Sequence, residues 1–226
     1  MIFKLKAPIL VVLVSALVGL GAAGVQASEF HCSVEPCKYV LNVDEAAGTK
    51  TAHHVIIIEN PAGESIAFTC NQLTGSSVFL EAKTTSSIFF GNLAYDQCFA
   101  NGSAKAEVRM NECDYGITSL GTIALWACNS KKEMEIEIPE TKCLFKIPEQ
   151  DFAAGSFSFH NTGSKSLITM EAFLGGIRNM VVTSTSTKAQ CGINISLGPL
   201  TGTYTTGNTI FTGQTAAGVM ASVWWE

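Results

Sequence analysis

Short runs of β-branched and aromatic residues recur along the chain after Cys37, and Gly, Asn, Ser or Pro interrupts them about every ten residues. This spacing is typical of antiparallel folds built from many short strands. The predicted strands lie at residues 54–58, 65–70, 87–90, 121–126, 156–159 and 179–183. No stretch after residue 27 repeats apolar residues at helical spacing over three turns, so we predict little helix. The pattern predicts an all-β fold, an antiparallel β-sandwich of two packed sheets or of two small β subdomains.

The clearest alternation is Glu-Met-Glu-Ile-Glu-Ile at residues 133–138. Successive side chains of a strand point to opposite faces, so the three glutamates share one face and the apolar residues share the other. Neighbouring carboxylates on that face lie about 7 Å apart, which is too far for them to share one calcium ion well. We therefore predict a solvated acidic face behind a packed apolar face.

Turn residues place three hairpins. Gly207-Asn208 stands between two Thr-rich arms and can supply the positive φ angles of a two-residue turn. Residues 119–121 predict a second turn, and residues 139–141 predict a third, before a strand at 143–147. Pro148 ends that strand because proline cannot donate to a ladder.

The first 27 residues have the features of a secretory signal peptide. Lys4 and Lys6 precede an apolar run at residues 9–20, and the small residues at 25–27 form a cleavage box. We place the cleavage after this box. The alternative is an uncleaved anchor, because the apolar stretch is almost as long as the ~20 residues that span a bilayer.

Composition supports an exported globular domain. The chain has 226 residues, of which 47% are apolar and 15% are charged, and this excludes a disordered chain. Without the signal, 12 basic residues face 19 acidic ones, a net charge of −7, so no basic surface is available for nucleic acid. Linkers and fixed-period repeats are absent, so we predict one domain over residues 28–226. A division near residues 110–113 is the alternative.

Eight cysteines follow the predicted cleavage point, and an even number in an exported chain predicts disulfides. They are Cys32, Cys37, Cys70, Cys98, Cys113, Cys128, Cys143 and Cys191. No Cys-x-x-Cys pair occurs, and the four histidines lack ligand spacing. We therefore predict neither a metal site nor a cofactor.

Two local arguments narrow the pairing of these cysteines. Cys32 and Cys37 enclose a short loop that contains Pro36, which favours a bridge between them. A turn centred between Leu120 and Gly121 places Cys113 opposite Cys128. The other cysteines then pair as Cys70 with Cys98 and Cys143 with Cys191. The alternative joins Cys113 to Cys143 and Cys128 to Cys191.

Short catalytic motifs are missing: Gly-x-Ser-x-Gly, Ser-x-x-Lys and His-Glu-x-x-His do not occur. His53 and His54 are neighbours on a predicted strand and point to opposite faces, so they cannot chelate one metal ion together. We expect one of them to be half-buried and the other to be solvated. We predict no catalytic residue. The alternative hypothesis is a secreted hydrolase with a site assembled from distant residues such as Asp96, Asp114, His160 or Glu171.

Two features suit binding. Trp224 and Trp225 are adjacent, and on a strand one of them faces outward, where an indole can stack on a sugar ring or a protein partner. The Thr-rich stretch 201–206, with Thr209 and Thr212, could present a ladder of hydroxyls. Exposed strands also favour threonine for its β-propensity alone, and a tryptophan pair can simply close a sheet edge.

Several ordered motifs resemble a known group of proteins. They are Met-Asn-Glu-Cys-Asp-Tyr at 110–115, Lys-Cys-Leu-Phe-Lys-Ile-Pro-Glu-Gln at 142–150 and Leu-Thr-Gly-Thr-Tyr at 200–204, with segments 55–70 and 95–98. Over most of residues 28–226 the chain resembles uncharacterised secreted proteins of soil actinobacteria. The resemblance implies an exported bacterial protein and carries no activity to any residue.

Together these observations predict a non-enzymatic, disulfide-stabilised protein that is secreted or associated with the cell envelope. Its role is predicted to be binding or structural, with a glycan or a protein as the partner.

Overall fold

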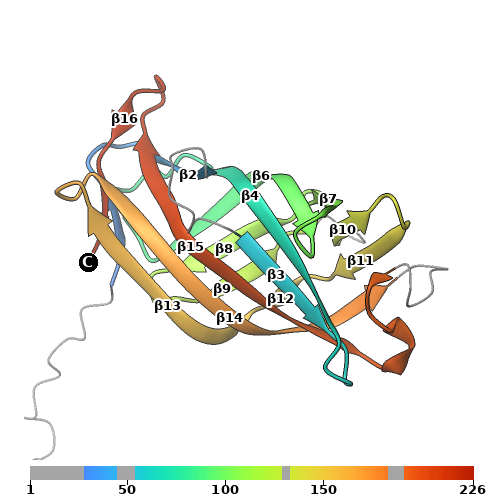
Figure 1. Cartoon of the computed structure of the whole chain (residues 1–226). Helices are drawn as coiled ribbons and strands as arrows, with labels where there is room; N and C mark the ends of the chain where they lie inside the picture. The colour runs from blue at the N-terminus through green and yellow to red at the C-terminus, as the bar shows by residue number, and fades with distance from the viewer. Residues whose placement is uncertain (1–27, 45–53, 129–132, 183–190) are drawn as a thin grey trace, which may run out of the picture.

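The computed structural model describes residues 28–44, 54–128, 133–182 and 191–226. The predicted signal peptide and His53 lie outside the described residues. The strands are β1 (Phe30–Cys32), β2 (Lys38–Asp44), β3 (His54–Glu59), β4 (Ser65–Ser77), β5 (Thr84–Thr85), β6 (Ser87–Ala100), β7 (Ala104–Arg109), β8 (Asp114–Thr118), β9 (Ile123–Trp126), β10 (Met134–Ile138), β11 (Cys143–Ile147), β12 (Gln150–Asp151), β13 (Ala153–Thr162), β14 (Leu167–Val182), β15 (Leu200–Gln214), β16 (Met220–Ala221) and β17 (Val223–Trp225). A 3-10 helix, η2, spans Ile195–Leu197. The predicted all-β class with little helix is confirmed (Figure 1).

The long strands form one antiparallel meander that closes on itself. In the described part of the chain, eight strand positions follow one another around the sheet, and some positions hold more than one strand. In order, they are β2 and β3 together; β4; β6; β7 and β8 together; β9 and β10 together; β11, β12 and β13 together; β14; and β15. The last position pairs with the first, because β15 is hydrogen-bonded to both β2 and β3. Strands β13, β14, β15 and β3 form the near wall in Figure 1, and β6, β8 and β9 lie behind them. The two predicted layers are therefore walls of one continuous antiparallel sheet.

Some positions hold two strands in line because the chain leaves the sheet and then returns. β6 pairs through Ser87–Phe90 with β8 and through Cys98–Ala100 with β7. Among the described strands, none pairs with residues 91–97 of β6 on that side. Residues 110–113, which connect β7 to β8, lie beside this gap. The wall is therefore interrupted on its outer surface at this point.

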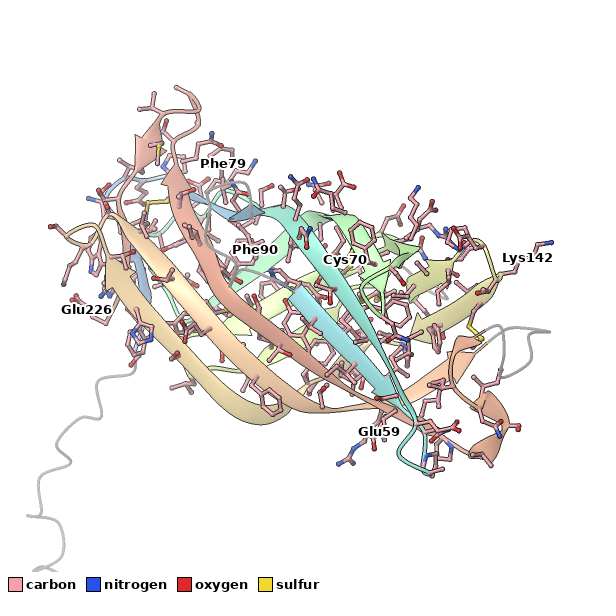
Figure 2. All side chains as sticks on the ribbon, viewed as in Figure 1. Glu59, Cys70, Phe79, Phe90, Lys142 and Glu226 are labelled. Atoms are coloured by element: carbon pink, nitrogen blue, oxygen red, sulfur yellow. A yellow bond between two sulfur atoms is a disulfide. The ribbon has the colours of Figure 1, made fainter. Side chains whose placement is uncertain are left out.

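The interior of the closed sheet is filled by large apolar side chains. Strand β10 shows the alternation: Met134, Ile136 and Ile138 are buried, whereas Glu135 and Glu137 are half-buried on the outer face. The predicted acidic face over a packed apolar face is confirmed. Fully buried aromatic residues include Phe30, Tyr39, Phe68, Phe90, Phe145 and Phe211. Figure 2 shows Phe90 inside the sheet, with Phe79 and Lys142 at its margin.

A small sheet of β17, β1 and β5 packs against one end of the meander. β17 contacts β13, β14 and β15, and the C-terminus lies beside the β13–β14 end in Figure 1. Phe30 of β1 is fully buried, and its ring meets that of Phe159 at 5.0 Å between centroids. This sheet therefore closes that end of the apolar interior.

Four disulfides join the pairs that the sequence favoured: Cys32–Cys37, Cys70–Cys98, Cys113–Cys128 and Cys143–Cys191. Cys70 and Cys98 face each other directly across β4 and β6. Disulfides persist in oxidising compartments, so the four bridges indicate an extracellular type of environment. No helix in the described part of the chain is long and apolar enough to cross a membrane.

The turn at Leu120 and Gly121 is confirmed, but its predicted register is wrong by one residue. Asp114 pairs with Trp126, so a strict ladder would set Cys113 opposite Ala127 rather than Cys128. Ala127 has a left-handed φ of 53°, which bends the chain just after β9. That bend lets Cys128 meet Cys113 even though the two residues are not directly opposed.

The predicted hairpin at Gly207-Asn208 is wrong, because both residues lie inside strand β15. The register of β14 with β15 shifts at this point, between the pair Ala172–Thr206 and the pair Met170–Thr209. Glycine within a strand commonly marks such a bulge. Here the bulge separates the half of β15 that pairs with β3 from the half that pairs with β2.

Candidate functional site

The outer face of β4, β6, β8 and β9 carries four residues in one row. Ser76 pairs with Gly91, and Asp114 pairs with Trp126. The β6–β8 register continues from Ser87–Phe90, which places Gly91 beside Asp114. The side chains of such a row point to the same face and lie about 5 Å apart. The carboxylate of Asp114 and the indole of Trp126 are therefore immediate neighbours outside the sheet.

A cavity of about 450 Å³ opens next to this row. Residues 76–78, 89, 91–93 and 110–114 line it, and we call it the Asp114 cleft. Its volume falls within the range of ~300–1,000 Å³ that is usual for small-ligand sites. Gly91 gives the carboxylate room, because a Cβ on Gly91 would lie 2.9 Å from Oδ1 of Asp114. The glycine thus lets Asp114 lean over β6 toward the cleft.

Asp114 is half-buried and has no partner in the part of the chain that the structure describes. No described residue donates a hydrogen bond to its carboxylate or forms an ion pair with it. Burial raises its pKa above the ordinary value, because removing water disfavours the charged form. A partly desolvated carboxylate without a protein donor can accept hydrogen bonds from a ligand.

Two exposed aromatic rings flank this carboxylate. The side chain of Phe89 is 46% exposed and that of Trp126 is 51% exposed, and their ring centroids lie 6.4 Å apart. Phe89 leans over Gly116, where an added Cβ would lie 3.0 Å from Cε1 of the ring. Phe89 lines the cleft, and Trp126 stands at its rim beside Asp114. Exposed aromatic faces of this kind are suited to stacking on another ring or on a cation.

The opposite side of the cleft is the turn at residues 110–113. The amide of Cys113 donates to the carbonyl of Met110 at 2.9 Å, and Nδ2 of Asn111 donates to the carbonyl of Glu133 at 2.9 Å. Asn111 and Glu112 both have left-handed backbone angles, with φ of 50° and 66°. The Cys113–Cys128 disulfide ties the turn to the end of β9. The cleft wall is thus held in place by covalent and polar contacts.

A second cavity, of about 600 Å³, lies further along the gap and is lined by residues 95–99 and 105–109. Most of its charged groups are engaged in ion pairs, and Asp96 accepts the backbone amide of Gln97 at 2.7 Å. Arg109 binds Glu137 at 2.6 Å, Glu135 at 3.3 Å and Glu107 at 3.7 Å, and Lys105 binds Glu107 at 3.2 Å. Apart from Asp96, the charged groups that line this cavity are therefore paired.

The interior of the closed sheet contains a buried polar cluster around His54. The ring of His54 contacts the hydroxyl of Tyr204 through Nδ1 and that of Thr206 through Nε2, the latter at 3.2 Å. The hydroxyls of Tyr95 and Tyr115 are 2.7 Å apart, and Tyr95 is also hydrogen-bonded to Tyr204. We call these five residues, with Thr209, which bonds Thr206 at 2.6 Å, the His54 cluster.

Burial controls the ionisation of this cluster. It lowers the pKa of His54 to about 3, so the imidazole is neutral near pH 7. It also raises the pKa of Tyr115 to about 12 and raises those of Tyr95 and Tyr204. All six side chains are buried, so the cluster is closed to a ligand from solvent. We expected one histidine of the pair to be half-buried, and His54 is instead fully buried.

The predicted binding aromatics, Trp224 and Trp225, lie on β17 and are both half-buried. Trp224 stacks on His31 at 5.2 Å between centroids, and Nζ of Lys165 lies 5.8 Å from its ring. Trp225 packs against Phe159 and donates from Nε1 to the carbonyl of Ser119 at 3.2 Å. Both indoles thus take part in closing the end of the fold, and a binding role for them stays a prediction.

The four residues of the hydrolase hypothesis do not form one site. Gly91 and Asp96 are five residues apart on β6, which puts Asp96 about 16 Å along the strand from the Asp114 row. Paired catalytic carboxyls of glycosidases stand only ~5–10 Å apart. His160 and Glu171 lie on adjacent strands, β13 and β14, of the opposite wall, where both are exposed.

Among the described residues, no group of three or more His, Cys, Asp or Glu side chains is placed to hold a metal ion. Comparison with known protein families, with curated proteins and with solved structures finds no match for the chain.

Sequence reasoning missed Phe89 and Trp126. The run of Ile88, Phe89 and Phe90 does not reveal which aromatic ring faces outward. The predicted register set Trp126 opposite Tyr115, whereas the true one sets it opposite Asp114. The one-residue error therefore hid the pairing of the exposed indole with a carboxylate.

Proposed function

We propose that the protein is exported and binds carbohydrate at the Asp114 cleft, without catalysing a reaction. The observation that carries the proposal is the exposed Phe89–Trp126 pair beside the carboxylate of Asp114, which has no partner among the described residues. Sugar rings present an apolar C–H face and several hydroxyl donors. An aromatic platform next to a hydrogen-bond acceptor complements both features.

The remaining features support an extracellular binding module. Four disulfides and a closed sheet give a rigid frame, and the cleft lies on the outer surface of that frame. Export from a bacterial cell and an association with the envelope belong to this proposal, as does the resemblance to secreted actinobacterial proteins. Rigid sites lose little conformational entropy on binding, which suits a small, specific ligand.

A pulldown on insoluble polysaccharides tests the proposal. Purified protein is mixed with chitin, cellulose and cell-wall peptidoglycan, and the bound fraction is measured for the wild type, Trp126→Ala and Phe89→Ala. We expect the wild type to be retained on at least one polymer and each variant to bind at least tenfold more weakly. Phe173→Ala is the matched control, because Phe173 is 50% exposed on the opposite wall. Equal retention of all four proteins would show that the cleft is not the binding site.

One observation favours hydrolysis as a second candidate function. Glu112 and Asp114 both line the cleft, so a bound glycan would meet two carboxyl groups. The same polysaccharide mixtures can be examined by mass spectrometry for released oligosaccharides. Release that depends on both carboxylates would establish the hydrolase in place of the binding module.

A further inference from the structure

The titratable side chains that line the Asp114 cleft are all acidic. Its titratable side chains are Glu112 and Asp114, and residues 76–78, 89, 91–93 and 110–114 include no Lys, Arg or His. Lys38 lies outside this lining, with its Nζ 5.7 Å from the centre of the Phe79 ring. The lining therefore contributes acidic groups and no basic ones to a bound ligand.

On and beside β10, the outer carboxylates are neutralised by neighbouring bases. Lys146 binds Glu133 at 3.6 Å and Glu135 at 3.4 Å, and Arg109 binds Glu137 at 2.6 Å. Asp114 differs, because it is half-buried and no described base reaches it. Burial also raises its pKa, which is the signature of a carboxylate that has lost water without gaining a partner. A cationic ligand group would restore the missing interaction.

The rings beside Asp114 favour the same ligand group. A protonated amine gains energy from the face of an indole or phenyl ring when it lies within about 6 Å of the ring centre. Trp126 is directly paired with Asp114, and Phe89 lies 6.4 Å from Trp126. One ammonium group placed over this corner could contact the carboxylate and a ring at the same time. An acetylated nitrogen carries no charge and would leave Asp114 unpaired.

We infer that the cleft selects sugars that carry a free protonated amine, as in polymers of deacetylated hexosamine, over their N-acetylated counterparts. This inference rests on the proposed carbohydrate binding. It assigns Asp114 to recognition of the ammonium group and Trp126 to stacking on the sugar ring. Sugars with carboxylate or sulfate groups are disfavoured by repulsion from Asp114.

Calorimetric titration with matched oligosaccharides tests this selectivity. Chitosan and chitin oligomers of equal length are titrated into the full folded protein in a buffer that keeps the amine protonated. We expect the deacetylated oligomer to bind at least tenfold more tightly, a difference of about 1.4 kcal/mol. We expect Asp114→Asn to reduce this preference to less than about twofold, and added salt to weaken the deacetylated oligomer selectively.

Controls separate the inference from the proposed function. Asp96→Asn removes the same charge from an exposed position on β6 outside the cleft lining and should keep the preference. Trp126→Ala should weaken both oligomers. Equal or tighter binding of the N-acetylated oligomer overturns the amine selectivity and leaves carbohydrate binding standing. Binding of neither oligomer, or equally tight binding of free putrescine, overturns carbohydrate recognition itself.

Discussion

The His54 cluster and the Asp114 cleft are two polar regions that lie on opposite faces of β6 and β8. Inside the sheet, Tyr95 and Tyr115 take part in a chain of hydrogen bonds with His54. Outside, Asp114 has no donor among the described residues. A buried polar group without a partner destabilises a fold, and within the His54 cluster the protein itself supplies the partners. An unsatisfied group at the surface can instead be completed by a ligand.

The difference between the buried cluster and the outer cleft predicts that stability and ligand binding respond to different substitutions. Removal of a disulfide should give the largest loss of stability. The Cys143–Cys191 bridge spans 48 residues and the Cys32–Cys37 bridge spans 5. Chain entropy assigns them about 4 and about 2 kcal/mol of stabilisation, respectively. Replacing Cys143 and Cys191 by Ser should therefore lower the melting temperature more than replacing Cys32 and Cys37, as measured by calorimetry.

The Cys113–Cys128 bridge sharpens this test because it holds the turn beside the cleft. Cys143 lies at the far end of the β10–β11 hairpin from that turn, so its loss should leave glycan affinity unchanged. Replacing Cys113 and Cys128 should lower both stability and affinity. If affinity survives that change intact, the turn at 110–113 does not form part of the binding wall.

Substitution of His54 should give the next largest effect. In His54→Ala the hydroxyls of Tyr204 and Thr206 lose a partner inside the sheet, and a cavity is left. Together these effects should cost about 3 kcal/mol in the free energy of unfolding, measured with urea. Carbohydrate affinity should stay within about twofold of the wild type. A large loss of affinity in a folded variant would mean that the interior and the cleft are coupled.

Parts of this architecture follow from the sequence by simple rules. The alternation at Glu133–Ile138 fixes which side chains are buried, because a strand has a period of two. The turn at residues 119–121 brings Cys113 and Cys128 within bonding range even when its register is wrong by one. The bridge at Cys32 and Cys37 follows from the short loop between them. These predictions depend on residues that are near one another in sequence.

The closed sheet and the cleft depend on residues that are far apart in sequence. Closure requires β15 to pair with β2 and β3, and no local pattern specifies that pairing. Gly207-Asn208 has the composition of a tight turn but serves as a bulge at the change from one partner strand to the other. Predicting the cleft requires knowing both the β6–β8 register and that the side chain of Phe89 points outward. A register error of one residue exchanges the two faces of a strand.

Acid should destabilise the protein through the His54 cluster. The pKa of His54 is about 3 in the fold and about 6.5 in an unfolded chain, so the folded state favours the neutral ring. A lowered pKa gives stability that is fully present above pH 6.5 and is lost as the pH falls toward 3. The loss contributed by this residue is about 1.4 kcal/mol for each pH unit.

Urea unfolding at several pH values measures this slope. His54→Ala should remove the contribution, and His160→Gln, at an exposed histidine, should retain it. If His54→Ala does not fold, the nitrogen chemical shifts of His54 in the wild type give the same information. A ring that becomes protonated near pH 6 would contradict the buried, neutral assignment.

The smallest expected change in stability comes from neutralising two outer carboxylates, Glu137 and Asp114, and it has opposite signs at the two positions. Glu137 accepts a 2.6 Å hydrogen bond from Arg109, and Glu137→Gln should lower stability by up to about 1 kcal/mol. Asp114 has a raised pKa because of burial, so its charged form is disfavoured in the fold at neutral pH. Asp114→Asn removes that charge and should raise stability by a few tenths of a kcal/mol, since solvent screens a half-exposed group.

Paired urea curves at pH 7 and pH 4 measure both variants. The gain from Asp114→Asn should shrink at pH 4, where the wild-type carboxyl begins to bind a proton. If Asp114→Asn stabilises the fold and abolishes amine selectivity, the role of Asp114 is to bind the ligand. If Asp114→Asn destabilises the fold as Glu137→Gln does, the role of Asp114 is structural.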